Sequence, residues 1–262
     1  MYTFILVGCS NDQLKNPVDF TEKQSFMTED LSINKMFILD DIILVGLGDS
    51  LTQGVGDERN LVGYIGRFQE EMSNFTGVRN VELLNLAHRG KRSDQLLEQI
   101  ESGKVNEELQ KADFLVMTIG GNDIMRIIKQ DLFSLSIDAF QKELIEFTHR
   151  YQKIINEIRK LNTDTPIVLI GLYNPFTVVT DQESEFDEIV VNWNKSINNI
   201  ATEDTKACYV PVDDLFNSNI NMVYHTDFFH PNSKGYDQMT NRILESLKTC
   251  GLNQLTNGEI DF

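Results

Sequence analysis

A serine in the N-terminal part of the chain and an Asp–His pair in the C-terminal part are the residue types of a nucleophile and the groups that activate it. Ser50 follows the apolar run 42–47 in a turn that contains Gly48, and Asp227 precedes His230 by three residues. A serine hydroxyl attacks a carbonyl only when a base takes its proton, and an imidazole does this best when a carboxylate orients it. If the fold brings Ser50 to His230, these residues are the parts of a nucleophilic hydrolase.

The turn around Ser50 leaves two interpretations open. The run 42–47 is short and apolar, as in a parallel strand buried on both faces, so Ser50 would follow the strand end where open α/β sheets bind ligands. Alternatively, Ser50 only caps the following helix. Spacing excludes other glycine-rich sites, because Leu51 replaces the third glycine of a dinucleotide site and Thr52 replaces the last glycine of the α/β-hydrolase elbow.

The pair Asp227 and His230 also has a structural alternative. In that alternative, Asn232 caps a helix that begins after the pair and His230 lies at the surface. The chain has only four histidines, so an imidazole one turn after a carboxylate is nevertheless a candidate general base.

Two further strand ends carry possible hydrogen-bond donors. The apolar runs 81–86 and 113–119 end shortly before Gly90 and Asn122. Acyl transfer passes through a tetrahedral oxyanion, and one preset donor lowers the barrier by about 3 kcal/mol. The N–H groups of Ser50 and Gly90 and the side chain of Asn122 are candidates, although glycine and asparagine also serve ordinary turns.

Four blocks of this sequence together resemble those of the SGNH, or GDSL-type, hydrolase family, in the family's order. The blocks are Gly48–Leu51, Asn85–Gly90, Gly120–Asp123 and Asp227–His230, and the resemblance covers about residues 40–250.

The resemblance implies a role for each matched residue. Ser50 is expected to be the nucleophile, His230 the general base and Asp227 its orienting carboxylate. Ser50, Gly90 and Asn122 are expected to form the oxyanion hole, without a cofactor or a metal. His88 and Arg89 depart from the family's usual second block and leave the electrostatics beside Gly90 open. The stretch 171–176 looks like the lipoprotein acylhydrolase branch of Gram-positive bacteria.

Strands and helices that alternate along the chain must position these residues. The pattern predicts a three-layer α/β/α sandwich with a five-stranded parallel sheet in the flavodoxin-like order 2-1-3-4-5. The expected strands are 42–47, 81–86, 113–119, 166–172 and 208–212. The expected helices include 62–75, a short one capped by Ser93, Asp138–Leu161 and two that contain 186–200 and 236–247. All four blocks then reach one edge of the sheet.

The expected activity is that of a serine esterase or lipase-like acylhydrolase that cleaves a small-molecule or lipid ester through an acyl-enzyme. Met125, Phe176, Phe228 and Phe229 are candidates for an acyl pocket, although they and the isoleucines at 124, 127 and 128 could equally be core. One alternative is an O-acetyl esterase for cell-envelope polysaccharide. Another is a non-catalytic protein that binds a glycan or lipid, but no catalytic position is lost here.

The net charge of the chain and its first eleven residues bear on where in the cell the protein acts. A net charge of −17 disfavours nucleic acid and anionic bilayers as partners. The segment Thr3–Asn11 resembles a lipobox with Cys9 as the lipidated residue, but no basic residue precedes Lys15. The alternative is a buried strand with an inert cysteine. We expect an extracytoplasmic lipoprotein that is membrane-anchored only through Cys9, with a cytoplasmic location as the alternative. Its expected parts are a truncated signal (1–9), a tether (10–39), the hydrolase domain (40–250) and a C-terminal tail (251–262).

Cys208 and Cys250 are the remaining cysteines. The first begins an apolar run and the second closes the final helix, so both could lie at the same end of the sheet. Sequence cannot set the Cα separation that a bridge demands, so we expect two unpaired, partly buried thiols.

Overall fold

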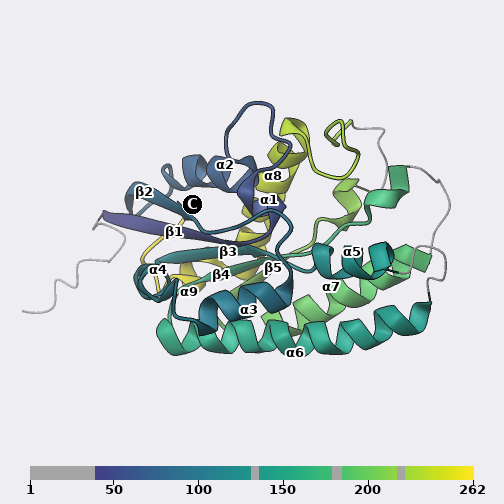
Figure 1. Ribbon diagram of the computed structural model, residues 1–262. Helices are drawn as coiled ribbons and strands as arrows, with labels where there is room; N and C mark the ends of the chain where they lie inside the picture. The colour runs from purple at the N-terminus through teal and green to yellow at the C-terminus, as the bar shows by residue number, and fades with distance from the viewer. Residues whose placement is uncertain (1–38, 131–135, 179–184, 217–221) are drawn as a thin grey trace, which may run out of the picture. The chain divides into compact units, whose positions relative to one another are not determined.

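Five parallel strands form one sheet in the described part of the chain (Figure 1). The computed structural model describes residues 39–130, 136–178, 185–216 and 222–262. The strands are β1 (Asp40–Gly48), β2 (Val78–Asn85), β3 (Phe114–Thr118), β4 (Ile167–Ile170) and β5 (Ala207–Val210). Their order, β2-β1-β3-β4-β5, is the predicted one.

Helices cover both faces of this sheet, so the predicted three-layer arrangement is confirmed (Figure 1). One face carries α1 (Ser50–Gln53), α2 (Gly63–Met72), α8 (Ser233–Cys250) and α9 (Leu252–Leu255). The other face carries α3 (Ser93–Glu101), α4 (Asn106–Lys111), α5 (Gly121–Gln130), α6 (Ile137–Leu161) and α7 (Glu185–Glu203). Two short 3-10 helices are η4 (Pro175–Val178) and η5 (Asp213–Phe216).

The strands read as unbroken apolar runs because both of their faces are buried. Leu44 and Val116 pack into the core under α2 and α8, whereas their neighbours Val45 and Leu115 pack into the core against α6. Successive side chains of a strand point to opposite faces, so each strand supplies both cores.

The longest helix follows its predicted span closely. α6 begins at Ile137, one residue before the expected Asp138, and ends at Leu161. Phe147, Tyr151 and Ile154 are fully buried, as their spacing of three and four residues requires.

Gly48 explains how the chain turns out of β1. Its φ of +110° is a conformation that favours glycine, and an added Cβ would lie 1.8 Å from the Thr118 carbonyl oxygen of β3. The backbone therefore passes close over β3 and places Ser50 at the carboxyl edge of the sheet.

Cys208 of β5 and Cys250 at the end of α8 form a disulfide, with their Cα atoms 5.9 Å apart. The expectation of two unpaired thiols is therefore wrong. The parallel β5 and the returning α8 bring both residues to the end of the sheet opposite Ser50, a proximity that sequence spacing does not encode. The segment beyond Cys250 is also packed, since Leu252, Leu255 and Ile260 are buried in the same core.

Residues 1–38 lie outside the described part of the chain, and with them Cys9 and the expected tether up to residue 38. Within the described residues, we find no helix with the length and apolar character that a membrane crossing needs.

Candidate active site

Ser50 is the first residue of α1, yet it does not cap that helix. Asp49 is the N-cap, and its carboxylate accepts a hydrogen bond from the Leu51 N–H at 3.1 Å. The interpretation of Ser50 as a helix cap is therefore wrong. The buried Ser50 hydroxyl lies instead 2.9 Å from Nε2 of His230.

Asp49 is itself fully enclosed beside this hydroxyl. Burial raises the pKa of its carboxyl to about 7, against the opposing hydrogen bonds from the Leu51 N–H and the Thr118 hydroxyl. Burial therefore favours the neutral, protonated form of this carboxyl.

His230 lies between Ser50 and Asp227. Its Nδ1 is 2.6 Å from the Asp227 carboxylate, which also accepts the N–H groups of His230 and Phe229. Burial alone would raise the pKa of Asp227, but these hydrogen bonds lower it to about 2. An ionised Asp227 requires the proton on Nδ1, which leaves Nε2 free to accept the Ser50 proton.

The alternative in which His230 lies at the surface is wrong, because its side chain is only 7% exposed. The other half of that alternative holds, since Asn232 is the N-cap of α8 and accepts the Gly235 N–H. One short loop thus starts a helix and holds a buried imidazole.

Gly90 and Asn122 line one cavity together with Ser50 and His230. Gly90 adopts a φ of +80° after β2, and Asn122 is in the first turn of α5. The Asn122 amide donates one N–H to the Lys91 carbonyl at 3.0 Å. Because the amide nitrogen has two hydrogens, the second N–H remains available for a ligand.

Asp123 joins the segments that carry these two donors. Its buried carboxylate accepts both the N–H and the hydroxyl of Ser93, and Arg150 approaches it at 3.2 Å. The expectation that Ser93 caps α3 is wrong, because Arg92 is the N-cap and the Ser93 hydroxyl is used on Asp123. This contact fixes the start of α3, three residues after Gly90, to the start of α5.

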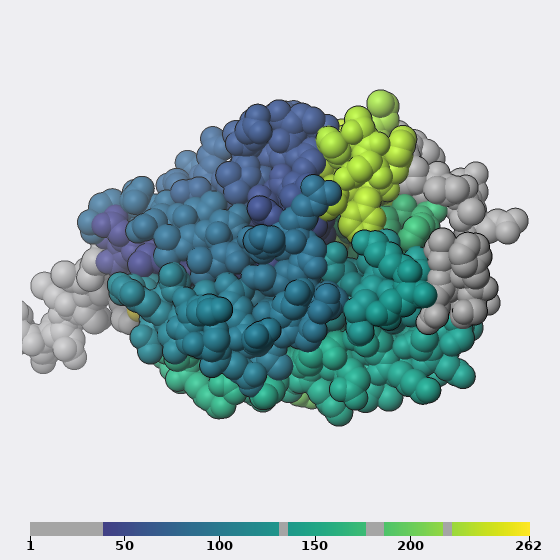
Figure 2. Space-filling model, in the orientation of Figure 1, coloured from purple at the N-terminus to yellow at the C-terminus, as the bar shows by residue number. Residues whose placement is uncertain are grey.

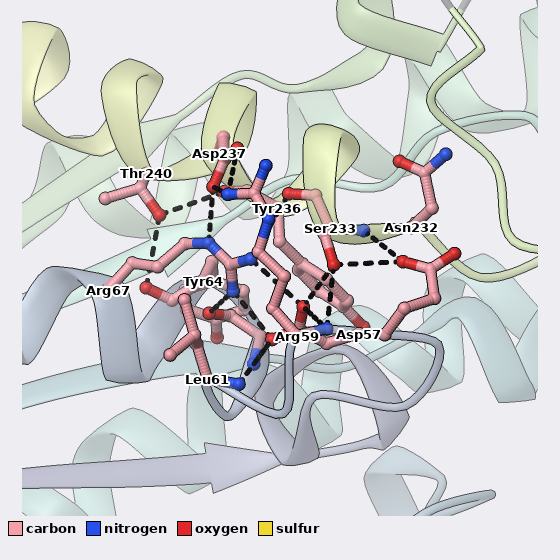
Figure 3. A network of polar contacts seen from close by, with 12 residues as sticks. Asp57, Arg59, Leu61, Tyr64, Arg67, Asn232, Ser233, Tyr236, Asp237 and Thr240 are labelled. Carbon is pink, nitrogen blue, oxygen red and sulfur yellow. Dashed lines mark hydrogen bonds and ion pairs between the residues drawn. The ribbon is translucent and has the colours of Figure 1, made fainter.

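A second polar network joins the loop after α1 to α2 and to the start of α8 (Figure 3). Arg67 of α2 makes a two-point ion pair with Asp57, with N–O distances of 2.7 and 3.0 Å, and also contacts Asp237 of α8. Asp57 accepts the Ser233 hydroxyl at 2.7 Å, and the Ser233 N–H donates to Glu58. The loop after α1 is therefore bonded to the start of α8.

This network connects the segment of Ser50 with the segment of His230. On the molecular surface, the blue segment after α1 lies beside the yellow-green segment around His230 (Figure 2). Sequence reasoning missed Arg67, although a signal existed: Arg67 shares a helix face with the buried residues Tyr64 and Phe68. A cation at such a position needs a buried carboxylate partner.

An apolar pocket opens on one side of Ser50. Its lining is mostly hydrophobic side chains from α5, η4 and α7 and from the loops after β4 and before α8. These include Ile124, Met125, Leu172, Pro175, Phe176, Phe186, Val190 and Phe229. The pocket is narrow, with a cavity volume of about 50 Å³.

Not every expected pocket residue is there. Phe228 does not line this pocket, because it is 58% exposed and turned outward by a φ of +53°. Ile127 and Ile128 are core residues, and Ile124 belongs both to the core and to the pocket wall.

A wider cavity of about 300 Å³ adjoins this pocket at Ser50, and we call it the polar cavity because most of the residues that line it are polar or charged. It contains His230, Gly90 and the two cationic side chains of Arg89 and Lys129. Among the described residues, no group of three or more His, Cys, Asp or Glu side chains could hold a metal ion.

The chain is similar in sequence to a known family and to two curated proteins. The model of the GDSL-like lipase/acylhydrolase family matches residues 47–238. The uncharacterized protein YpmR of Bacillus subtilis (strain 168) is 36% identical over 215 residues, which make up 81% of this chain and 84% of that protein. The spore germination lipase LipC of Bacillus licheniformis is 25% identical over 225 residues, or 80% of this chain and 96% of that protein.

Solved structures share the fold. The lipase Lip_vut3 from a goat rumen metagenome superposes with a TM-score of 0.67 at 23% identity, covering 82% of this chain and 99% of that chain. The acetylxylan esterase Axe2 from Geobacillus stearothermophilus gives a TM-score of 0.60 at 18% identity, covering 82% and 96%.

Proposed function

The chain belongs to the GDSL-like lipase/acylhydrolase family and is an ester-bond hydrolase, and from this premise we propose that it is a serine esterase that works through an acyl-enzyme on Ser50. The observation that carries the proposal is the unbroken chain of contacts from Ser50 Oγ to His230 (2.9 Å) and from His230 to Asp227 (2.6 Å).

In the first half of the reaction, His230 takes the Ser50 proton as the serine oxygen bonds to the ester carbonyl carbon. The carbonyl oxygen becomes an oxyanion, which the N–H groups of Ser50 and Gly90 and the free amide hydrogen of Asn122 stabilise. Asp227 stabilises the imidazolium without taking its proton. The bond to the alcohol then breaks, and His230 protonates the departing oxygen.

In the second half, water replaces the alcohol. His230 takes a proton from the water as its oxygen bonds to the acyl carbon, and then returns a proton to Ser50 as the carboxylic acid leaves. No group beyond the chain's own residues and water enters these steps.

The apolar lining of the pocket favours an aliphatic acyl chain longer than acetyl as the acid portion of the ester. Ser50 lines this pocket together with apolar side chains such as Met125 and Phe176, so an aliphatic chain attached to Ser50 would move from water into apolar surroundings. A lipid or other acyl ester is therefore the proposed substrate class. A cell-envelope O-acetyl group would place only a methyl group against this apolar wall.

The decisive experiment combines ester turnover with labelling by a fluorophosphonate probe. We expect the wild-type protein to hydrolyse a p-nitrophenyl ester and to be labelled, and Ser50→Ala to lose both. Ser102→Ala, an exposed serine at the end of α3, is the matched control and keeps both. If Ser50→Ala retained turnover and labelling, the assignment of Ser50 as the nucleophile would be wrong. A folded wild-type protein that is neither active nor labelled would instead be a non-catalytic binding protein.

The proposed location is extracytoplasmic, with a lipid anchor at Cys9 as in the lipoprotein branch of Gram-positive bacteria. The disulfide between Cys208 and Cys250 supports this location, because such bonds persist in oxidising compartments. Metabolic labelling with an alkyne fatty acid tests the anchor. Incorporation that survives Cys9→Ser would exclude Cys9 as the attachment site.

A further inference from the structure

The polar cavity beside His230 is a different environment from the apolar pocket. Both cavities include Ser50, Asn122, Met125 and Phe229 in their walls. His230 and Gly90 line only the polar one in this pair of cavities, together with Arg89 and Lys129. The two cavities therefore adjoin at Ser50, and of the two only the polar cavity has the imidazole in its wall.

The proposed reaction decides which part of the ester enters which cavity. His230 must donate a proton to the departing alcohol oxygen, so the alcohol has to lie on the side of Ser50 that contains the imidazole. This is the polar cavity. The acyl chain then occupies the apolar pocket, which has no imidazole in its wall.

Arg89 is exceptional among the arginines of this protein. All nine arginines lie in the described part of the chain, and eight of them form ion pairs with carboxylates. Within the described residues Arg89 has no ion pair, and Lys129 across the cavity has none either. The backbone N–H of Arg89 donates to Gln53, which fixes the chain while the guanidinium is left for a ligand.

We propose that Arg89 and Lys129 recognise a negative charge on the alcohol portion of the substrate, so that the preferred ester is that of an anionic alcohol such as a phosphate-bearing glycerol. This inference rests on the proposed esterase function. Guanidinium and ammonium groups are the usual protein partners of phosphate oxygens.

The positive charges of Arg89 and Lys129 stand out against the net negative charge of the protein. The whole chain carries a net charge of −17, which repels anions at long range, so two unneutralised cations beside Ser50 are contrary to the general field. Asp227 also lines the cavity and is ionised, so the charged residues of its wall are two cations and one carboxylate, an excess of one positive charge.

The test compares two esters that differ only in the charge of the alcohol, 1-octanoylglycerol and 1-octanoylglycerol 3-phosphate. We expect a higher kcat/KM for the phosphate ester and a preference that weakens as salt is added. Arg89→Gln should reduce the ratio of the two kcat/KM values by about fivefold, as expected for one solvent-exposed charge contact. Arg79→Gln removes an exposed arginine at the start of β2 and should leave the ratio unchanged.

The outcomes separate this inference from the proposed function. If the wild-type protein cleaves both esters equally and Arg89→Gln has the same ratio, the anionic subsite is wrong while the esterase stands. If the wild-type protein prefers the phosphate ester and a single substitution at Arg89 or Lys129 lowers that preference while Arg79→Gln does not, the inference is supported. If neither ester is cleaved and no fluorophosphonate label is incorporated, both proposals fall.

Discussion

Arg67 holds Asp57 in a two-point ion pair under the loop that links α1 to α2, and the same carboxylate accepts the hydroxyl of Ser233, three residues after His230. The side chain of Asp57 is fully buried and that of Arg67 is 7% exposed. Two segments that stand far apart in the sequence are therefore tied together where Ser50 meets His230.

Arg67→Met should destabilise the protein by about 3–5 kcal/mol, because it leaves the Asp57 carboxylate buried without its cation. Urea unfolding measures this loss. Turnover of the folded variant should also fall, since the start of α8 is released. Arg79→Met removes an exposed pair with Asp41 and should cost less than about 1 kcal/mol. Equal stability of the two variants would contradict a structural role for the buried pair.

Asn122→Ala should lower kcat by about 10²–10³ with little change in KM, because the amide would bind the oxyanion and not the ground-state ester. Steady-state kinetics on a p-nitrophenyl ester measure both constants. Asn156→Ala on the exposed face of α6 is the control and should match the wild type. A loss confined to KM would mean that Asn122 holds the substrate but not the transition state.

Val190→Phe should shift the preferred acyl length toward short chains, because Val190 lines the apolar pocket and a larger side chain would fill it. Val191→Phe is the matched control, since Val191 is the next residue of α7 and is 55% exposed. A series of p-nitrophenyl esters from acetate to laurate measures the profile. If both variants keep the wild-type profile, the acyl chain lies elsewhere.

Asp49 should make stability fall as pH rises. Its pKa is about 7 in the folded protein against an ordinary value of 3.8, so between these values the folded chain holds a proton that the unfolded chain has released. Stability from this proton is complete below about pH 4 and is lost through pH 7, at about 1.4 kcal/mol per pH unit and up to about 4 kcal/mol in all.

The comparison with Asp49→Asn isolates that contribution. The free energy of unfolding of the wild type, minus that of the variant, should decrease from about pH 4 to about pH 7 and then level off. Urea unfolding at a series of pH values measures the difference. A constant difference would show that the Asp49 carboxyl keeps an ordinary pKa.

Removing the disulfide should destabilise the protein by up to about 4 kcal/mol, since Cys208 and Cys250 are 42 residues apart and the bond restricts the unfolded chain. We expect dithiothreitol to lower the urea midpoint of the wild type. The Cys208→Ala/Cys250→Ala variant should unfold at the lower midpoint with or without the reductant. A reductant effect of the same size in this variant would assign the stabilisation to another cause.

The order of strands and helices could be predicted from local patterns. Runs such as 42–47 are apolar without interruption because both faces of a central strand are buried, and α6 repeats its apolar residues every three or four positions. The residue that caps a helix is set less strictly by local patterns. Ser93 is of a good capping type, but its hydroxyl is used on Asp123, a contact between segments that no local rule contains.

The sequence by itself determined the chemical types at the site and the sheet edge at which they gather, because strand ends and turn residues act locally and parallel strands end together. Only the tertiary structure decided that Asp49 caps α1, that Arg67 is paired with Asp57 and that Cys208 is bonded to Cys250. It also decided that Arg89 has no carboxylate partner among the residues that the structure describes. Each of these depends on distances between segments that packing alone sets. The 2.9 Å contact between Ser50 and His230, across 180 positions of the chain, is of the same kind.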